Sequence, residues 1–230
     1  MVIGNGLVAN RFMKYKDDKS ITIFASGVSN SKETNYESYK REFTLLKQTL
    51  SNYDETILVY FSTCSIEDPD LATAPYIIHK KEVEEYITEN AERYYIFRVS
   101  NLAGISNNPY TLLNYFIFHI ASGHIINIWK NAYRNIIGIN DMHGIINYIL
   151  NEGETMNTIT NIANTKNYSI SYIIRCIEEH LNKKTIKKEI NKGTDYKIDV
   201  SAVEPIINKL NIQFDDNYLP TLLKNYYHSR

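Results

Sequence analysis

The chain of 230 residues has little cysteine and almost no net charge. Its two cysteines, Cys64 and Cys176, are too few for a disulfide framework, and their spacing does not suit a zinc site. A formal net charge of −1 at pH 7 gives no electrostatic reason for binding nucleic acid or an anionic membrane. We therefore expect no metal site, no nucleic-acid partner and no membrane partner.

Long apolar runs are also missing. No stretch approaches the roughly 18 consecutive apolar residues of a membrane-spanning helix. Residues 1–25 lack the basic start, the apolar core and the cleavage site of a secretory signal, so we expect a cytoplasmic protein. At this length the chain can bury one sizeable core, either as one domain with an appended lobe or as two small domains.

The sequence does contain a regular alternation of strand and helix patterns. Short apolar runs predict strands at 1–4, 21–25, 57–61, 94–98 and 134–140. Helices are predicted between or after these strands, at 7–15, 34–51, 76–89, 110–122 and 141–151. This alternation predicts an α/β fold, with a parallel sheet covered by helices on both faces.

Tyr76 and Lys80 form the most informative pair in the sequence. They lie four positions apart in a predicted helix, so both side chains share one helix face. A phenol with a pKa of about 10 is a poor acid or base at neutral pH. The nearby ammonium is expected to bring the pKa of Tyr76 down toward the range that general acid–base catalysis needs. Thr63 follows a predicted strand, where its hydroxyl can hold a substrate oxygen against the phenol.

A glycine turn follows the first predicted strand. In Gly4-Asn-Gly6-Leu-Val-Ala9 the first glycine permits the tight turn, and the second lets a pyrophosphate approach the backbone. The small Ala9 lets the helix pack closely on the strand, so that a pyrophosphate faces the helix N-terminus. The motif predicts a dinucleotide site, although similar turns also occur at ordinary strand–helix junctions.

Together these features resemble the extended branch of the short-chain dehydrogenase/reductase family, whose members mostly act on nucleotide-linked sugars. The resemblance implies a Rossmann-type fold that binds NAD or NADP. It implies catalytic roles for Thr63, Tyr76 and Lys80, with Tyr76 transferring the proton. It also implies cofactor contacts from the glycine turn, the next strand end and the catalytic helix, at Gly4, Gly6, Leu7, Val8, Ser26, Gly27, Tyr76 and Lys80.

The resemblance continues downstream. The segment Arg-Val-Ser-Asn-Leu-Ala-Gly at 98–104 is similar to a family motif whose asparagine contacts the substrate's diphosphate. The segment 134–141 is similar to a motif whose arginine pairs with a sugar-nucleotide phosphate, a task that suits the planar guanidinium. We therefore predict substrate-binding roles for Ser65, Asn101 and Arg134. We also expect Asp141 to be a helix N-cap.

The chain departs from the family on the adenosine side. Only residues 16–20 separate the first predicted helix from the strand at 21–25, where members usually place two further strands. The sheet should therefore be shortened by about two strands, with the N-terminal strand at its edge. Residues 10–20 or the second subunit of a homodimer are expected to cover that edge. The choice between NAD and NADP stays open, because Arg11, Lys14 and Lys16 are either surface cations or contacts to a 2′-phosphate.

Further departures concern the predicted site. No Asp-Glu pair follows Thr63, and family dehydratases use that pair for elimination, so 4,6-dehydration is not expected. Glu42 takes the place of an asparagine that acts in a proton relay in the family; it either pairs with Lys80 or faces solvent. We expect His79 to point away from the site.

We expect two parts in the chain. Residues 1–104 should form the Rossmann-type domain, its sheet completed by 134–151, and residues 105–133 and 152–230 should form a substrate-binding lobe. Within the lobe we predict a strand at 158–163, a helix at 169–181 capped by Ser169, a solvated basic strand or loop at 183–188, and an amphipathic helix at 218–227.

The resemblance implies an NAD(P)-dependent oxidoreductase on a nucleotide-activated sugar, and we favour ketoreduction. A reductase exchanges its cofactor in every turnover and tolerates the weaker binding that a short adenosine side implies. Two alternatives stay open: an epimerase that holds NAD tightly, and a non-catalytic protein that binds a nucleotide or nucleotide sugar. The sequence does not identify the sugar, because fold analogy gives only the class.

Overall fold

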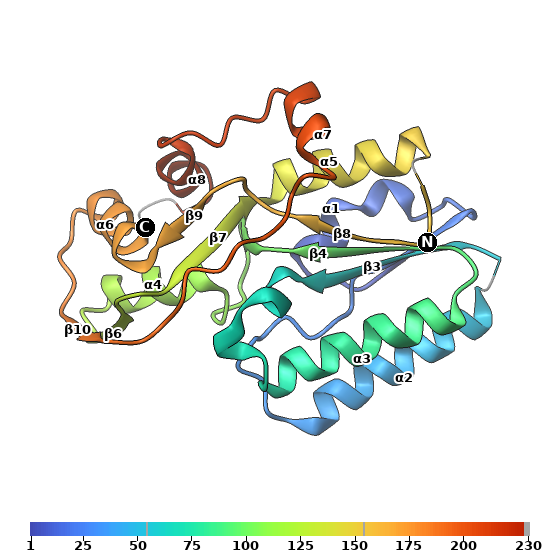
Figure 1. The fold of residues 1–230 in the computed structure, drawn as a ribbon, viewed down its shortest axis with the longest axis horizontal. Coiled ribbons are helices and arrows are strands. Elements are labelled where there is room, and N and C mark those ends of the chain that lie inside the picture. The colour runs from blue at the N-terminus through green and yellow to red at the C-terminus, as the bar shows by residue number, and fades with distance from the viewer. Residues whose placement is uncertain (54, 154, 228–230) are drawn as a thin grey trace.

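The computed structural model describes residues 1–53, 55–153 and 155–227, and its centre is a parallel sheet (Figure 1). The sheet has five strands in the order β1 (Val2–Ile3), β2 (Ile21–Phe24), β3 (Ile57–Thr63), β4 (Tyr94–Val99) and β8 (Thr158–Ile162). Every neighbouring pair in it is parallel. The predicted Rossmann-type α/β fold is therefore confirmed.

Helices cover both faces of this sheet. Figure 1 shows α2 (Tyr36–Asn52) and α3 (Pro75–Asn90) on one face, with α1 (Leu7–Arg11) and α5 (Ile139–Glu152) on the other. Because successive side chains of a strand point to opposite faces, β3 supplies both cores. Val59 packs into the core on the α1 and α5 side, whereas Leu58 and Tyr60 pack into the core beneath α2 and α3.

The remaining elements are short and lie largely beyond the carboxyl ends of the main strands. They are η1 (Met13–Tyr15), η2 (Cys64–Glu67), η3 (Pro69–Leu71), β5 (Asn101–Ala103), α4 (Leu112–Ala121), β6 (Ile126–Trp129), β7 (Tyr133–Gly138), β9 (Asn167–Ser169), α6 (Ile170–Leu181), β10 (Lys187–Ile190), α7 (Glu204–Lys209) and α8 (Tyr218–Tyr226). Two small sheets, β5-β7-β9 and β10-β6, organise this region. Within the described ranges, no helix combines the length and apolar character needed to cross a membrane.

The main sheet is completed by β8, so the prediction that 134–151 completes it is wrong. The chain turns at Ser100, whose backbone N–H donates to the carbonyl of Ile162, and continues into β5. Strand β7 then pairs with β5 and not with β4. The chain leaves β7 through α5 and returns to place β8 beside β4. The strand predicted at 158–163 exists, but it belongs to the central sheet.

Strand β1 lies at the edge of the sheet, as the short connection between the first two strands predicts. The N-terminal amine fixes its start by donating to the carbonyls of Asp18 and Ile21. Phe12 and Tyr15 are buried, and the ring of Phe12 lies 5.3 Å from that of Phe61 on β3. Residues 10–20 therefore pack on a face of the sheet. A second subunit at the edge stays a prediction.

Two predicted helix caps have different outcomes. Ser169 caps α6, because its hydroxyl accepts a hydrogen bond from the backbone N–H of Tyr172. Asp141 is not an N-cap: α5 begins earlier, with Gly138 in that position. Asp141 lies in the first turn and accepts a hydrogen bond of 2.5 Å from the Tyr218 hydroxyl, which links α8 to the start of α5.

His143 makes the stability of this fold depend on pH. Its ring lies 4.9 Å from that of Phe12, and its Nε2 is buried without a hydrogen-bond partner among the described residues. Burial, together with the positive charges of Arg11 and Lys14, lowers the pKa of His143 to about 4. The unfolded chain takes up this proton near pH 6.5. Stability is therefore full above that pH and falls as the pH drops toward 4.

We predict that His143→Leu weakens the loss of stability between pH 7.5 and pH 4.5, because the variant has no imidazole to protonate. Urea unfolding at both pH values measures this difference. The exposed His124 provides the control, and His124→Leu should keep the wild-type difference. An unchanged pH dependence in His143→Leu would contradict the prediction.

Candidate functional site

The topology brings the predicted residues to one edge of the sheet. The glycine turn follows β1, Ser26 and Gly27 follow β2, and Thr63 ends β3. Asn101 follows β4. Carboxyl ends of parallel strands meet at the same edge, where open α/β sheets bind their ligands.

Tyr76 and Lys80 enter this edge from α3. Pro75 occupies the first helical position, where its missing N–H costs nothing and its fixed φ suits the helix. Tyr76 and Lys80 are both buried, with 7% and 1% of their surface exposed. The Lys80 Nζ lies 5.8 Å from the centre of the Tyr76 ring, and the Thr63 side chain lies close enough to the phenol to lower its pKa. The structure therefore brings together the three residues that the sequence singled out.

The expected lowering of the Tyr76 pKa does not occur. Burial raises the pKa of Tyr76 above its usual value, and the negative charge of Glu42 acts in the same direction. The charge of Lys80 and the nearby Thr63 side chain oppose this rise but do not overcome it. The ammonium alone would lower the pKa of the phenol, but removal of the phenol from water outweighs that effect. Tyr76 is therefore a protonated phenol at neutral pH.

Lys80 is bound to a carboxylate inside the protein. Its Nζ lies 2.9 Å from Glu42 Oε1 on α2 and donates to the Tyr60 hydroxyl at 2.8 Å. The Tyr60 hydroxyl donates in turn to Glu42 Oε1 at 2.6 Å. Glu42 and Tyr60 have no exposed surface. Of the two arrangements that the sequence left open for Glu42, the structure has the pair with Lys80.

The second oxygen of Glu42 is also occupied. Its Oε2 accepts a hydrogen bond of 2.6 Å from the backbone N–H of Val28 and lies 3.0 Å from Nε2 of His79. The prediction that His79 points away is therefore wrong. Burial alone would raise the pKa of Glu42, but Lys80 and these hydrogen bonds hold it far below its usual range. Glu42 is a carboxylate with every oxygen partnered.

The glycine turn has the backbone geometry that the sequence predicts. Gly4 has a φ of +124°, and a Cβ there would lie 2.3 Å from the carbonyl oxygen of Ala25. Only glycine fits this close approach of β1's exit to β2. Gly6 precedes α1 as its N-cap and is exposed. Leu7 and Val8 are half-buried, and the Leu7 side chain packs against Gly104.

Ser26 and Gly27 have distinct neighbours. Ser26 is held by Arg41 of α2, which donates to its hydroxyl at 3.2 Å and to its carbonyl at 2.9 Å. Gly27 lies over the buried ion pair, since a Cβ there would be 2.8 Å from the Lys80 Nζ and 2.9 Å from Glu42 Oε1. The exit of β2 is therefore in contact with the predicted catalytic lysine.

The predicted phosphate ligand Arg134 already has a carboxylate partner. Its Nη1 lies 3.3 Å from Oδ2 of Asp68, whose side chain is 1% exposed. Burial raises the pKa of Asp68, while the charge of Arg134 lowers it. Burial raises the pKa of Tyr196 to about 12, and Arg134 and Ser65 both lie close enough to oppose this rise. Two of the predicted substrate residues, Ser65 and Arg134, therefore meet around Asp68 and Tyr196.

Asn101 holds the neighbouring strand. Its side-chain amide donates to the carbonyl of Asn135 at 2.8 Å, and its backbone pairs β5 with Ile136 of β7. Asn101 therefore contacts Asn135, the residue that follows Arg134, and its amide nitrogen is bonded to the backbone there.

Four residues of the site escaped sequence reasoning or were placed wrongly. They are Tyr60, Asp68, His79 and Tyr196. Tyr60 lies in an apolar strand and reads as core, and Asp68 precedes Pro69 and reads as a turn residue. Tyr196 lies outside any helix or strand and carries no local signal.

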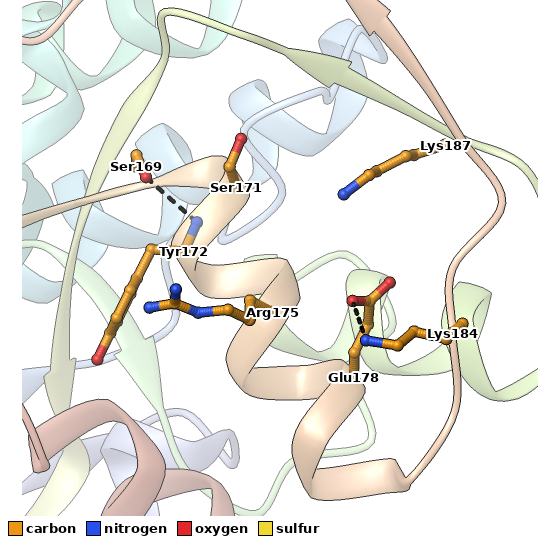
Figure 2. A pocket seen from close by; sticks show the side chains of 7 residues that line it. All are labelled: Ser169, Ser171, Tyr172, Arg175, Glu178, Lys184 and Lys187. Atoms are coloured by element: carbon orange, nitrogen blue, oxygen red, sulfur yellow. Dashed lines mark hydrogen bonds and ion pairs between the residues drawn. The ribbon is translucent and has the colours of Figure 1, made fainter.

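An open hollow lies elsewhere, between α6 and β10 (Figure 2). Its wall carries the cations Arg175, Lys184 and Lys187 and the carboxylate Glu178, with Lys184 and Glu178 paired at 3.6 Å. None of the residues that line it belongs to the predicted site. Its cations are exposed, whereas Glu178 is buried.

Solved structures share the fold described above. A dTDP-glucose 4,6-dehydratase from Bacillus anthracis, in complex with NAD, is 15% identical; the match covers 95% of this chain and 76% of that one, with a TM-score of 0.65. A UDP-glucose 4-epimerase from Thermus thermophilus, in complex with NAD, is 12% identical over 94% and 79%, with a TM-score of 0.64. RMD from Pseudomonas aeruginosa, complexed with NADPH, is 12% identical over 89% and 79%, with a TM-score of 0.62.

No protein-family model matches the chain, and no curated protein matches it in sequence. At these identities the similarity establishes the fold. The chain thus has the fold of NAD-binding, nucleotide-sugar epimerases and dehydratases of the short-chain dehydrogenase/reductase type. The main sheet ends at β1, where the family usually continues with further strands.

We predict that Gly27→Ala destabilises the protein by about 1–3 kcal/mol, because the added methyl group overpacks a buried site and separates the Lys80 and Glu42 head groups. Urea unfolding without ligand measures the change. Gly6→Ala is the matched control, since a Cβ there meets no atom within 4 Å. It should change stability by less than about 0.5 kcal/mol. Equal effects of the two substitutions would contradict the prediction.

Proposed function

We propose that the protein is an NAD(P)-dependent oxidoreductase of a nucleotide-activated sugar, and that it reduces a keto group. One observation carries the proposal: Thr63, Tyr76 and Lys80 meet, buried, at the strand edge that the glycine turn also joins. The solved structures of the same fold are named as nucleotide-sugar enzymes or are complexed with NAD or NADPH, which supports the substrate class and the cofactor.

The residues have separate roles in this proposal. Tyr76 transfers the proton, Thr63 orients the reacting oxygen, and Lys80 holds the nicotinamide ribose. A bound nicotinamide supplies or accepts the hydride. Gly4, Gly6, Leu7 and Val8 bind the pyrophosphate side, where the open backbone at Gly6 has room for a ligand. Ser26 and Gly27 lie between the glycine turn and Lys80.

The substrate's diphosphate binds at the other end of the site, with Arg134 as its cation and with Ser65 and Asn101 nearby. Asp68 offsets the positive charge of Arg134 at this end of the site, because the two side chains are already paired. A phosphate must therefore compete with Asp68 or use the remaining guanidinium N–H groups. Arginine suits such sharing because it presents five donors in a planar fork.

Reduction fits the short sheet better than epimerisation. An epimerase depends on NAD that stays bound, and the sheet lacks the strands that hold adenosine in the family. A reductase releases its cofactor in every cycle. Assays of NADH and NADPH oxidation across a panel of 4-keto nucleotide sugars test this choice. Lack of turnover with either cofactor, together with interconversion of epimers by the protein with bound NAD, would contradict the reductase and support an epimerase.

A non-catalytic nucleotide-binding protein is the second candidate. The observation in its favour is that both proposed cationic ligands, Lys80 and Arg134, already have carboxylate partners. Calorimetric titration separates the candidates. Strong affinity for a nucleotide sugar with negligible affinity for NAD(P) would favour the binding protein.

We predict that Tyr76→Phe lowers turnover by about 10²–10⁴-fold, the usual contribution of a general acid or base. Ligand affinity and folding should stay close to wild type, because the ring and its packing remain. Steady-state kinetics and calorimetry measure these effects. Tyr15→Phe is the control: it also removes a buried hydroxyl, one bonded to Asn147, and should retain turnover. A Tyr76→Phe enzyme that keeps most of its turnover would remove the assigned mechanism.

We predict that Arg134→Ala raises KM by about tenfold or more, the value of one or two hydrogen bonds to a charged group. The fall in kcat should be smaller if the contact is equal in the ground and transition states. Because Arg134→Ala leaves Asp68 buried and unpaired, Arg134→Lys provides a second variant that keeps a cation beside Asp68.

The control for this experiment is Lys166→Ala, which removes a half-exposed cation paired with Asp216. Its KM should match wild type. An unchanged KM in both Arg134 variants would show that the substrate phosphates bind elsewhere.

A further inference from the structure

The Glu42 carboxylate is the most completely partnered charged group around the predicted site. It has no exposed surface, and it holds Lys80 at 2.9 Å through one oxygen. The other oxygen accepts from the Val28 backbone at 2.6 Å. A buried carboxylate is costly to place unless it is paired and hydrogen-bonded. This costly buried carboxylate is bonded directly to Lys80, the lysine that lies beside Tyr76.

The charges that face Tyr76 come from both packed elements. Titratable and polar groups around it are Lys80 and His79 on α3, Glu42 and Tyr39 on α2, and Tyr60 and Thr63 on β3. Tyr39 donates to the backbone carbonyl of Glu33, which brings a further carboxylate near this group. Within this set, Lys80 forms an ion pair with Glu42.

We propose that Glu42 is a positioning residue that fixes the Lys80 ammonium and offsets its charge, so that Tyr76 works as a proton donor. This inference rests on the proposed reductase function and deepens it. Lys80 without Glu42 would act on the phenol as an uncompensated charge and would favour the phenolate. A donor must hold its proton before the reaction begins.

The proton balance follows from this role. In ketone reduction, a bound reduced nicotinamide would supply a hydride to the carbonyl carbon. Tyr76 gives its phenolic proton to the carbonyl oxygen as the π bond breaks, so that one C–H and one O–H bond form. The resulting phenolate beside Lys80 then takes up a proton from solvent. Glu42 stays ionised throughout and transfers no proton.

The electrostatics agree with the geometry. Burial raises the pKa of Tyr76, Glu42 raises it further, and Lys80 lowers it. Removal of the Glu42 charge therefore lowers the pKa of Tyr76. If Glu42 merely filled space, neutralising it would leave the pKa of Tyr76 unchanged.

The test titrates Tyr76 itself and needs no cofactor. Protein with ¹³C-labelled tyrosine rings is titrated by NMR, and the Tyr76 signal is assigned by its loss in Tyr76→Phe. In Glu42→Gln the phenol should ionise about one pH unit or more below wild type, the size of a nearby-charge effect. If the wild-type phenol stays protonated over the whole range in which the protein is folded, ionisation within that range in Glu42→Gln supports the proposal.

Glu84→Gln is the matched control. Glu84 is also buried on a helix of the site, 4% exposed, and pairs with Arg98 at 2.6 Å. Its neutralisation disrupts a comparable ion pair and should leave the Tyr76 titration unchanged. Equal titration of Tyr76 in wild type and Glu42→Gln would overturn the proposal, and so would an equal shift in Glu84→Gln.

Glu42→Asp covers the case in which Glu42→Gln does not fold. It keeps the charge but withdraws it from Lys80 by one methylene, so Tyr76 should ionise at a pH below wild type by a smaller amount. An unshifted Tyr76 in a folded Glu42→Asp then overturns the proposal. In parallel, the pH above which reductase activity is lost should be lowered in both variants, and by more in Glu42→Gln than in Glu42→Asp. Absence of wild-type turnover would count against the reductase function, whereas the titration decides the role of Glu42 independently.

Discussion

The buried ion pair between Lys80 and Glu42 is the constraint on which the site depends. It joins three elements of the fold, because Lys80 lies on α3, Glu42 on α2, and the Tyr60 hydroxyl that contacts both lies on β3. A buried pair of this kind adds little net stability, since desolvation costs about as much as the attraction returns. Its effect is on position. With every oxygen of Glu42 occupied, Lys80 has one place to lie, and Tyr76 is one helical turn away.

The same arrangement recurs at the other cations of the site. Arg134 is paired with Asp68, and Arg98 with Glu84, so these half-buried cations at the sheet edge also have carboxylate partners. The edge is therefore close to neutral, as the net charge of the whole chain is. An anionic substrate would gain from hydrogen-bond geometry more than from long-range attraction. Specificity at such a site depends on the placement of donors, which is a property of the fold more than of composition.

The sequence predicted most of the central sheet and the residues at its edge, for physical reasons that can be named. Strand and helix periodicities are local, so β2, β3, β4, α2 and α3 were placed within a few residues. The Tyr76 and Lys80 pair was readable because helix geometry fixes which residues share a face. Long-range facts were not readable: β8 and not 134–151 completes the sheet, and nothing local distinguishes these strands. The prediction of a lowered pKa for Tyr76 was wrong for the same reason, because burial is set by tertiary packing.

The shortened sheet separates two functions that the fold usually combines. Tyr76, Lys80, Glu42 and Thr63 are positioned by β3 and the helices beside it, and β3 has a neighbour on each side. Loss of strands beyond β1 leaves these contacts intact. The glycine turn depends on β1 and on the close approach of Gly4 to Ala25, which also lies inside the remaining sheet. In the proposed function, the shorter sheet would remove contacts to the adenosine end of a dinucleotide and leave the geometry at the nicotinamide end undisturbed. In the proposed reductase, this arrangement would keep Tyr76 oriented as a proton donor while weakening the hold on the cofactor.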